Sequence, residues 1–280
     1  MSNPSESVTP TLLRGWGLPD PGGSKKARGR AAVVGGSPLS PGAVMLSGEA
    51  ALRVGAGLAT LFVPEELALG IALAFPEAGV HALPRRHPDR LPEGVAAQLE
   101  QAQAVLVGPG FDDPEETEAR VRAVAAVVDG PVLLDAFALG VLPQLDRAIL
   151  PWSLVLTPNG EEAALLLGDD EREIDADAVA EIARRYDAVV SCHGMVAAPD
   201  GSSWEIVGGS PALGTSGSGD ALSGAIVGFL ARGVEPAQAA VWGTWAHTRA
   251  GNRLGARGGI GFLARELVQE LPAAVGEVLA

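Results

Sequence analysis

Cysteine and long apolar runs are scarce in this sequence of 280 residues. The one cysteine, Cys192, excludes an intramolecular disulfide and fits a reducing compartment. No uninterrupted apolar run reaches the roughly 18 residues that a membrane helix needs. The segment Met1–Pro10 is polar and has no apolar centre, so we expect no signal peptide. These absences predict a cytoplasmic protein with no membrane partner.

Basic charge and aromatic side chains are also in short supply. The 20 Lys and Arg residues against 34 Asp and Glu give a net charge of −14, which disfavours a nucleic acid partner. A nucleotide can still bind, because backbone N–H groups and a metal ion govern that contact. With 4% aromatic residues, Ala, Val and Leu must build the core. Such a core suits helices packed closely on a parallel sheet.

Two common phosphate-binding motifs are absent, and a different glycine-rich loop is present. The sequence has no G-x-x-x-x-G-K-[ST] motif, and no G-x-G-x-x-G motif follows its first predicted strand. Residues 214–224 instead read Gly-Thr-Ser-Gly-Ser-Gly-Asp-Ala-Leu-Ser-Gly, and apolar residues at helical spacing follow. A loop of this kind directs free N–H groups and the positive end of a helix dipole at an anion. The stretch therefore predicts an anion site.

Asp220 adds a carboxylate to the first turn of that predicted helix. A site that only binds phosphate gains nothing from a second negative charge, whereas a site that deprotonates a hydroxyl beside a phosphoryl group needs both. The alternative is an Asp that merely caps a helix after a flexible loop. We favour the phosphoryl chemistry because three glycines surround Asp220. The helix N-terminus predicts a lowered pKa for this carboxyl.

The remaining chain alternates short buried strands with helices. The predicted strands are 31–34, 58–63, 105–107, 132–134, 154–156 and 189–191, followed by a hairpin over 195–198 and 203–207. In an open parallel sheet the carboxyl ends of the strands line one crevice, where ligands bind. The residues expected to meet there are Gly35–Ser37, Gly108–Gly110, Asp135 and Thr157–Asn159.

The two less regular stretches are the N-terminus and residues 64–94. Residues 1–24 are rich in Ser, Pro and Gly, and we expect a flexible arm in which only Leu12, Leu13 and Trp16 could dock. Residues 64–94 are rich in proline, and we expect one helix plus irregular connections there. Because no linker follows the arm, residues 25–280 are predicted to form one domain.

The motifs together resemble a known family. Residues 217–224 resemble the G-[ST]-G-D signature of the ribokinase-like superfamily, and nearly the whole chain from Lys25 is similar to the ADP- or ATP-dependent NAD(P)H-hydrate dehydratases. Further matching blocks are Val33–Ser37 with Pro41–Ala43, Ala50–Gly57, Val107–Gly110, Leu134–Ala136, Leu156–Asn159 with Glu162, Pro211–Leu213, and Ala246–His247 with Ala250–Asn252. The resemblance implies a three-layer α/β/α ribokinase-like fold with a central, mostly parallel sheet.

The resemblance also implies an activity. A family member phosphorylates the hydroxyl of hydrated NADH or NADPH with ADP or ATP and Mg²⁺, and then eliminates phosphate to restore the reduced cofactor. Asp220 would be the catalytic base and would also contact the substrate. The other implied residues are Ala43, Gly108, Gly110 and Asn159 for the substrate, Gly217, Ser218, Gly219, Cys192, His193 and Gly194 for the nucleotide, and Asp135 and Glu162 for the metal. A homo-oligomer is expected.

The sequence departs from the family pattern at three places. Phe137 stands where a second Asp is usual, Asn159 stands where His is frequent, and residues 191–194 read Ser-Cys-His-Gly where a Lys-Gly pair is expected. Two alternatives therefore stay open at this point. One is a ribokinase-like kinase acting on a vitamin-precursor alcohol, and the other is a nucleotide-binding relative with weakened or no catalysis.

Overall fold

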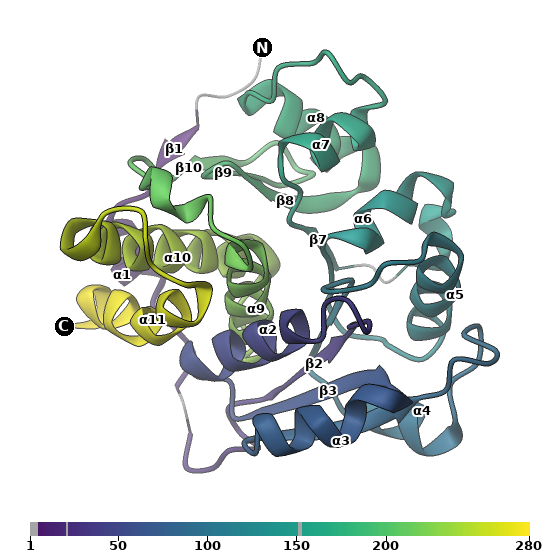
Figure 1. Cartoon of the computed structure of the whole chain (residues 1–280). Coiled ribbons are helices and arrows are strands. Elements are labelled where there is room, and N and C mark those ends of the chain that lie inside the picture. Colours follow the sequence, from purple (N-terminus) through teal and green to yellow (C-terminus); the bar gives the residue numbers. More distant parts are fainter. Residues whose placement is uncertain (1–4, 21, 151–152) are drawn as a thin grey trace.

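The computed structural model describes residues 5–20, 22–150 and 153–280, and its centre is a single mixed sheet (Figure 1). The strand order is β1-β10-β9-β8-β7-β6-β5-β2-β3-β4. The strands are β1 (Glu6–Ser7), β2 (Arg30–Val34), β3 (Leu58–Pro64), β4 (Ala78–Leu83), β5 (Ala104–Val107), β6 (Val132–Leu134), β7 (Leu154–Leu156), β8 (Ala188–Cys192), β9 (Met195–Ala197) and β10 (Ser203–Glu205). The seven strands from β8 to β4 run parallel, and β9 pairs antiparallel with both β8 and β10. This confirms the predicted parallel sheet with a hairpin beside it.

Helices cover both faces of the sheet. They are α1 (Pro10–Trp16), α2 (Gly42–Arg53), α3 (Glu65–Ala74), α4 (Glu93–Leu99), α5 (Pro114–Ala125), α6 (Phe137–Val141), α7 (Gly160–Leu167), α8 (Ala176–Tyr186), α9 (Ser218–Ala231), α10 (Pro236–Gly258) and α11 (Ala264–Leu279). None of the helices in the described part of the chain combines the length and the apolar character that a bilayer crossing needs.

The alternation of side chains along the strands divides the core in two. Ala31 and Val33 of β2 pack on one side with α2, α9, α10 and α11, whereas Ala32 and Val34 pack on the other side with α4 to α8. Successive residues of a strand point to opposite faces, so an apolar run such as 31–34 is buried only between two helical layers. The predicted three-layer α/β/α architecture is therefore confirmed.

Small residues bring α9 close to α2 and so fix the position of the glycine-rich loop. A Cβ atom on Gly224 would lie 2.4 Å from the Ser47 carbonyl oxygen, and one on Gly228 would lie 2.5 Å from Val54 Cγ2. Only glycine permits such close approach of two backbones. The N-terminus of α9 is thereby held at the carboxyl end of the sheet.

The N-terminal segment differs from the expected loose arm in its described part. Strand β1 pairs with β10, α1 follows, and Leu13 of α1 is fully buried in the core beside α11. Trp16 also packs edge-on against Trp204. Residues 1–4 and 21 lie outside the described residues, and the domain boundary at residue 25 stays a prediction.

The expectation of one helix in residues 64–94 is wrong. Two helices begin there, and strand β4 lies between them at the edge of the sheet, parallel to β3. Only Leu83 of β4 is buried, because an edge strand packs few of its side chains. The apolar pattern of this strand is therefore too weak to predict it.

Candidate functional site

The carboxyl ends of four parallel strands meet at one rim, as the sequence predicts. The Gly36 N–H, after β2, donates to the Pro109 carbonyl oxygen, after β5, at 2.8 Å. A Cβ atom on Gly108 would lie 1.8 Å from the Asp135 carbonyl oxygen, after β6. The Thr157 hydroxyl, after β7, donates to Asp135 Oδ1 at 2.9 Å. Four predicted loops thus form one continuous surface.

Asp220 lies in the first turn of α9, as predicted, but its acidity differs from the prediction. Burial raises the pKa of its carboxyl to about 6, where the helix N-terminus was expected to lower it. Desolvation disfavours the charged form, and here it outweighs the helix dipole. Asp220 is still mostly ionised at neutral pH and is a stronger base than an exposed Asp.

Asp135 is a second carboxylate of the site and is almost fully buried. Burial raises its pKa to about 7, and the charges of Asp220 and Glu162 act in the same direction. Hydrogen bonds from Ser223 and Thr157 oppose the rise. The site therefore holds negative charge that the surrounding protein does not compensate.

Asp135 and Glu162 are the two residues expected to hold a metal ion, and they are close enough for the charge of Glu162 to raise the Asp135 pKa. Glu162 also helps to cap helix α7. One oxygen of Glu162 accepts the Asn159 N–H at 2.9 Å, in a capping box that begins α7. In the described residues no group of three His, Cys, Asp or Glu side chains forms a ready-made metal site. Mg²⁺ commonly takes only one or two carboxylates and fills the remaining positions with phosphate and water oxygens. Asp135 and Glu162 therefore fit Mg²⁺ by their donor chemistry.

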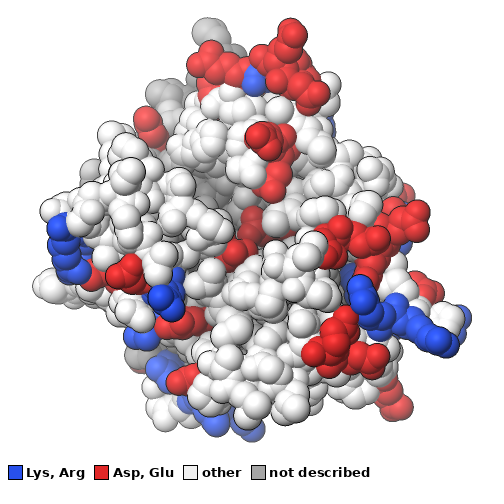
Figure 2. Space-filling model, in the orientation of Figure 1, with Lys and Arg blue, Asp and Glu red and all other residues white. Residues whose placement is uncertain are grey.

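A cavity of about 530 Å³ opens beside the N-terminus of α9. Its lining comes from Thr157–Asn159, Ser191, His193–Gly194, Ile206, Gly209–Ser210, Leu213–Thr215, Ser218–Gly219, Leu222, Thr244 and His247–Thr248. No side chain caps this helix N-terminus, and its N-cap Gly217 has a φ of 85°. Figure 2 shows a face hollowed in its middle, with acidic side chains in the hollow and Lys and Arg near the margins. The cavity offers an anion site at the helix and a partly apolar wall beyond it.

Of the three residues expected to bind the nucleotide from the Ser-Cys-His-Gly stretch, two lie at the cavity and one lies in the core. His193 and Gly194 line the cavity, but Cys192 does not. The Cys192 side chain is buried in the core beside α7 and α8, and burial raises its thiol pKa to about 12. Neighbouring residues of β8 point to opposite faces, so Cys192 points away from the cavity that Ser191 lines. The assignment of Cys192 to nucleotide binding therefore has no side-chain contact to support it.

From the sequence, His247 was named only within a block that matches the family and no residue of α10 was assigned to the site, but α10 lines this cavity. Thr244 donates to the Ala240 carbonyl oxygen at 2.8 Å, so the 2.6 Å bond between Ser191 and Thr244 uses the Ser191 proton. His247 Nε2 lies 2.9 Å from the Ser218 hydroxyl and 3.0 Å from the Ser218 carbonyl oxygen, so the imidazole ring is held against the first turn of α9. Burial lowers the His247 pKa to about 4 and keeps the ring neutral. Thr244, His247 and Thr248 are spaced three and four residues apart, so the sequence already places these polar side chains on one face of a helix and could have indicated this wall of the cavity.

The residues expected on the substrate side form a separate wall. A Cβ atom on Gly110 would lie 3.1 Å from Ala43 Cβ and 2.5 Å from the Ser40 carbonyl oxygen. Asn159 lies across the rim as the exposed N-cap of α7. Phe137, in place of the usual second Asp, begins α6 beside Asp135 and is 40% exposed. Asp220 directly follows Ser218 and Gly219, which line the cavity, and its charge raises the pKa of Asp135 at the rim.

Comparison with known proteins points to one family. The model of the NAD(P)H-hydrate dehydratase family matches residues 31–273. The chain is 44% identical over 276 residues to an ADP-dependent (S)-NAD(P)H-hydrate dehydratase of Xanthomonas campestris, covering 95% of this chain and 94% of that protein. It is 35% identical over 261 residues to the bifunctional NAD(P)H-hydrate repair enzyme Nnr of Escherichia coli, covering 90% of this chain and 48% of that protein. The chain thus spans about half the length of this bifunctional relative.

Solved structures agree with this result. The ADP/ATP-dependent NAD(P)H-hydrate dehydratase of Bacillus subtilis, co-crystallised with ATP and Mg²⁺, superposes with a TM-score of 0.84 at 27% identity, covering 98% of this chain and 99% of that one. A ribokinase-like superfamily protein of Enterococcus faecalis superposes with a TM-score of 0.84 at 23% identity, covering 98% and 96% of the two chains. The second match supports the fold alone.

Proposed function

Because the chain belongs to the NAD(P)H-hydrate dehydratase family, we propose that it is an ADP- or ATP-dependent (S)-NAD(P)H-hydrate dehydratase, a hydro-lyase that repairs hydrated NADH and NADPH. In this reaction the terminal phosphoryl group of the nucleotide moves to the ring hydroxyl of the hydrate. Loss of phosphate from that carbon, together with a proton from the adjacent carbon, then restores the double bond of the reduced nicotinamide.

The observation that carries the proposal is the Asp220 carboxylate. It lies in the uncapped first turn of α9, close enough to Asp135 at the rim for its charge to raise the pKa of that carboxyl, and its own pKa of about 6 suits proton transfer near neutral pH. Asp220 would accept the proton of the hydrate hydroxyl as the phosphoryl group approaches. A role of Asp220 as this base fits the dehydratase reaction, whereas a residue that only capped α9 would take no part in it.

The cavity beside α9 is the proposed nucleotide site. Gly217, Ser218 and Gly219 would hold the phosphates, since a helix N-terminus favours anions. The N–H groups of Gly217 and Gly219 would be the donors, because the Ser218 N–H already donates to the Thr215 carbonyl oxygen at 3.1 Å. His193 and Gly194 would contact the nucleotide further along the cavity, in the place where a Lys-Gly pair is expected. The volume of about 530 Å³ lies within the usual range for small-molecule sites.

Asp135 and Glu162 are the proposed holders of Mg²⁺. A bound Mg²⁺ would neutralise the negative charge that gathers on the transferring phosphoryl group. Burial raises the Asp135 pKa most, and the charges of Asp220 and Glu162 raise it further; a bound cation would relieve this repulsion. The nucleotide could then bind to an acidic protein without repulsion.

The wall of small residues is the proposed substrate site. Ala43, Gly108 and Gly110 leave room for the nicotinamide ring close to the backbone, and Asn159 can donate or accept a hydrogen bond opposite them. Asn159 cannot carry the charge of the His that is frequent in the family. The expected homo-oligomer and the cytoplasmic location stay predictions.

The decisive test is to incubate the protein with hydrated NADH, Mg²⁺ and either ADP or ATP, and to follow the absorbance of the reduced nicotinamide. Return of this absorbance with equimolar release of phosphate supports the dehydratase, and comparison of the nucleotides identifies the donor. A kinase of a vitamin-precursor alcohol would phosphorylate that alcohol and leave the hydrate unchanged. A protein that binds nucleotide and restores no absorbance would be the non-catalytic relative.

A further inference from the structure

Ser37 is a buried hydroxyl without a hydrogen-bond partner in the described structure. It follows β2 and the glycine turn, its residue is 3% exposed, and its Oγ atom meets no donor or acceptor. Leaving such a group unpaired costs about 1–3 kcal/mol, so native proteins rarely do so without a reason. The reason should lie in the small pocket that Ser37 lines.

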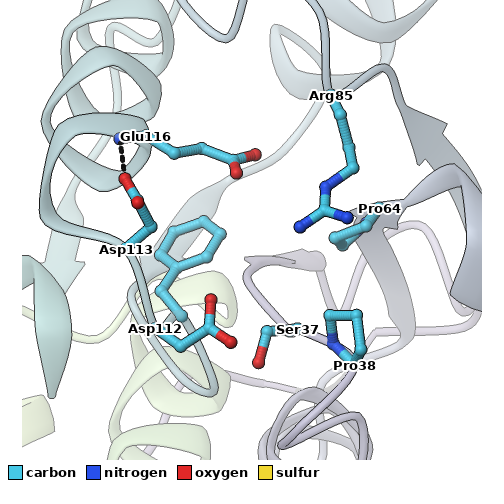
Figure 3. Close-up of a pocket in the computed structure, with 9 residues that line it drawn as sticks. Ser37, Pro38, Pro64, Arg85, Asp112, Asp113 and Glu116 are labelled. Atoms are coloured by element: carbon cyan, nitrogen blue, oxygen red, sulfur yellow. Dashed lines mark hydrogen bonds between the residues drawn. The ribbon is translucent and has the colours of Figure 1, made fainter.

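The pocket lies between the loop after β5 and the loop after β4 (Figure 3). Its lining is Gly36–Pro38, Pro64, Arg85, Phe111–Asp113 and Glu116. Figure 3 shows the Ser37 hydroxyl and the Asp112 carboxylate both directed into the pocket, with the Arg85 side chain opposite. The space of about 10 Å³ in this partly open pocket has room for one hydroxyl group or one water molecule.

The side chains around the pocket differ in how far they are already engaged. Asp113 is the N-cap of α5 and accepts the Glu116 N–H at 2.7 Å. Arg85 is paired with Glu66 at 3.2 Å. Asp112 makes no hydrogen bond or ion pair with any described residue. Ser37 and Asp112 are therefore the two groups that are free to bind a ligand.

The charge of the pocket selects the ligand chemistry. Glu116 is paired with Arg120, and Arg85 is paired with Glu66. The carboxylates of Asp112 and Asp113 therefore leave the pocket negatively charged, and a phosphate would be repelled. A sugar hydroxyl suits the pocket better, because a carboxylate only accepts hydrogen bonds and a hydroxyl can donate one. The serine hydroxyl can then complete the hydrogen bonding of the same group.

The pocket adjoins the proposed substrate wall. A Cβ atom on Gly110 would lie 3.2 Å from Gly36 Cα, and Gly36 lines the pocket. Asp112 follows Gly110 by two residues. A dinucleotide whose ring lies against Ala43 and Gly110 would therefore have its adjoining ribose within reach of this pocket.

We propose that Ser37 and Asp112 form a subsite that binds a hydroxyl group of the ribose next to the hydrated nicotinamide ring. The proposal rests on the proposed function, since it names the part of that substrate which enters the pocket. Asp112 accepts the hydrogen bond of the ribose hydroxyl, and the ribose oxygen or the adjacent hydroxyl pairs with Ser37. Substrate binding would thereby satisfy the unpaired serine.

The test is the dissociation constant of hydrated NADH, measured by calorimetry for the wild-type protein and three variants. We expect Ser37→Ala to raise this constant about threefold to tenfold and Asp112→Asn to raise it about tenfold, the usual effects of losing a neutral and a charged hydrogen bond. The dissociation constant of ADP with Mg²⁺ should not change. Ser37→Ala should not lower the melting temperature, because the hydroxyl has no partner in the free protein.

Asp113→Asn is the matched control. It removes the same charge from the same pocket, but the Asp113 carboxylate already caps α5, and Asn caps a helix equally well. Hydrate affinity within twofold of wild type in both Ser37→Ala and Asp112→Asn would overturn the subsite, and so would an equal loss in Asp113→Asn. The constants need no turnover, so a protein that binds the hydrate and restores no absorbance would overturn the proposed function alone.

Discussion

At the scale of single residues, Asp220 experiences two opposing effects. The N-terminus of α9 stabilises its carboxylate, while the surrounding side chains remove water from it. Burial is the larger effect and raises the pKa to about 6. A base with this pKa is ionised at pH 7 and accepts a proton more readily than an exposed Asp.

We expect Asp220→Asn to lower kcat by roughly 10²–10⁴-fold, the usual loss for a positioned general base. Stability at pH 7 should rise slightly, because a carboxyl whose pKa is raised on folding destabilises the native state above that pKa. This gain should disappear as the pH falls through 6 toward 4, because the wild-type Asp220 carboxyl is then protonated and as uncharged as the Asn of the variant. Steady-state kinetics and melting curves at several pH values measure both effects. Turnover within a few-fold of wild type would show that Asp220 only begins the helix.

The buried His247 should make the free energy of unfolding depend on pH in the acid range. Its pKa falls from 6.5 to about 4 because of burial, so the unfolded chain binds a proton that the folded chain does not. The neutral His247 therefore costs the folded protein no stability above pH 6.5. As the pH falls from 6.5 toward 4, the free energy of unfolding should decrease by roughly 3 kcal/mol at most, because only the unfolded chain gains the proton.

We therefore expect His247→Gln, whose side-chain amide can hydrogen-bond to the same two Ser218 oxygens, to lose less stability than the wild type between pH 6.5 and 4. Denaturant unfolding at both pH values provides the comparison. Parallel losses in the two proteins would mean that His247 does not control acid stability.

At the scale of elements, the contact between α9 and α2 places the glycine-rich loop. Gly228 lies against Val54 and Ala51, and a Cβ atom there would overlap both. We expect Gly228→Ala to lower the free energy of unfolding by about 1–3 kcal/mol, although Ala is the better helix former.

Gly70 is the control for this variant. It lies in α3, and a Cβ atom there would meet nothing within 4 Å. Gly70→Ala should raise the free energy of unfolding by about 0.5–1 kcal/mol. If both variants stabilise the protein, the contact of α9 with α2 is looser than the structure indicates.

The N-terminal helix gives a second prediction at this scale. Leu13 is fully buried, so Leu13→Ala should cost about 2–5 kcal/mol of stability by removing apolar contacts and leaving a cavity. Thr11→Ala, at an exposed position of the same helix, should change stability by less than about 0.5 kcal/mol. Thermal or denaturant unfolding measures both. An equally small effect of the two variants would support the flexible arm expected from the sequence.

At the scale of the whole molecule, an acidic protein must bind an anionic nucleotide. The net charge of −14 and the carboxylates in the central hollow repel ADP and ATP (Figure 2). Excess EDTA should therefore reduce turnover by at least about 100-fold and weaken nucleotide binding, since the phosphates then meet Asp135 and Glu162 without a cation. Added Mg²⁺ should restore both. Full activity in EDTA would remove these two residues from the metal site.

Local sequence determined the elements that carry the chemistry. Continuous apolar runs such as Val132–Leu134 and Leu154–Leu156 appear as strands with the predicted bounds, because strands buried on both faces leave few alternatives. The glycine-rich loop before α9 was also predicted from the sequence, since glycines directly before a helical pattern mark a turn that other residues rarely adopt, such as Gly217 with its φ of 85°. The convergence of Gly108, Asp135 and Thr157 followed from the rule that parallel strands end at one edge.

Only the tertiary structure decided features that depend on distant neighbours. The edge strand β4 forms because β3 offers hydrogen bonds, although few of its own side chains are buried. The direction of Cys192 follows from the register of β8, and the acidity of Asp220 follows from packing that no spacing reveals. The unpaired hydroxyl of Ser37 is of the same kind, because whether a polar atom finds a partner depends on residues remote in sequence.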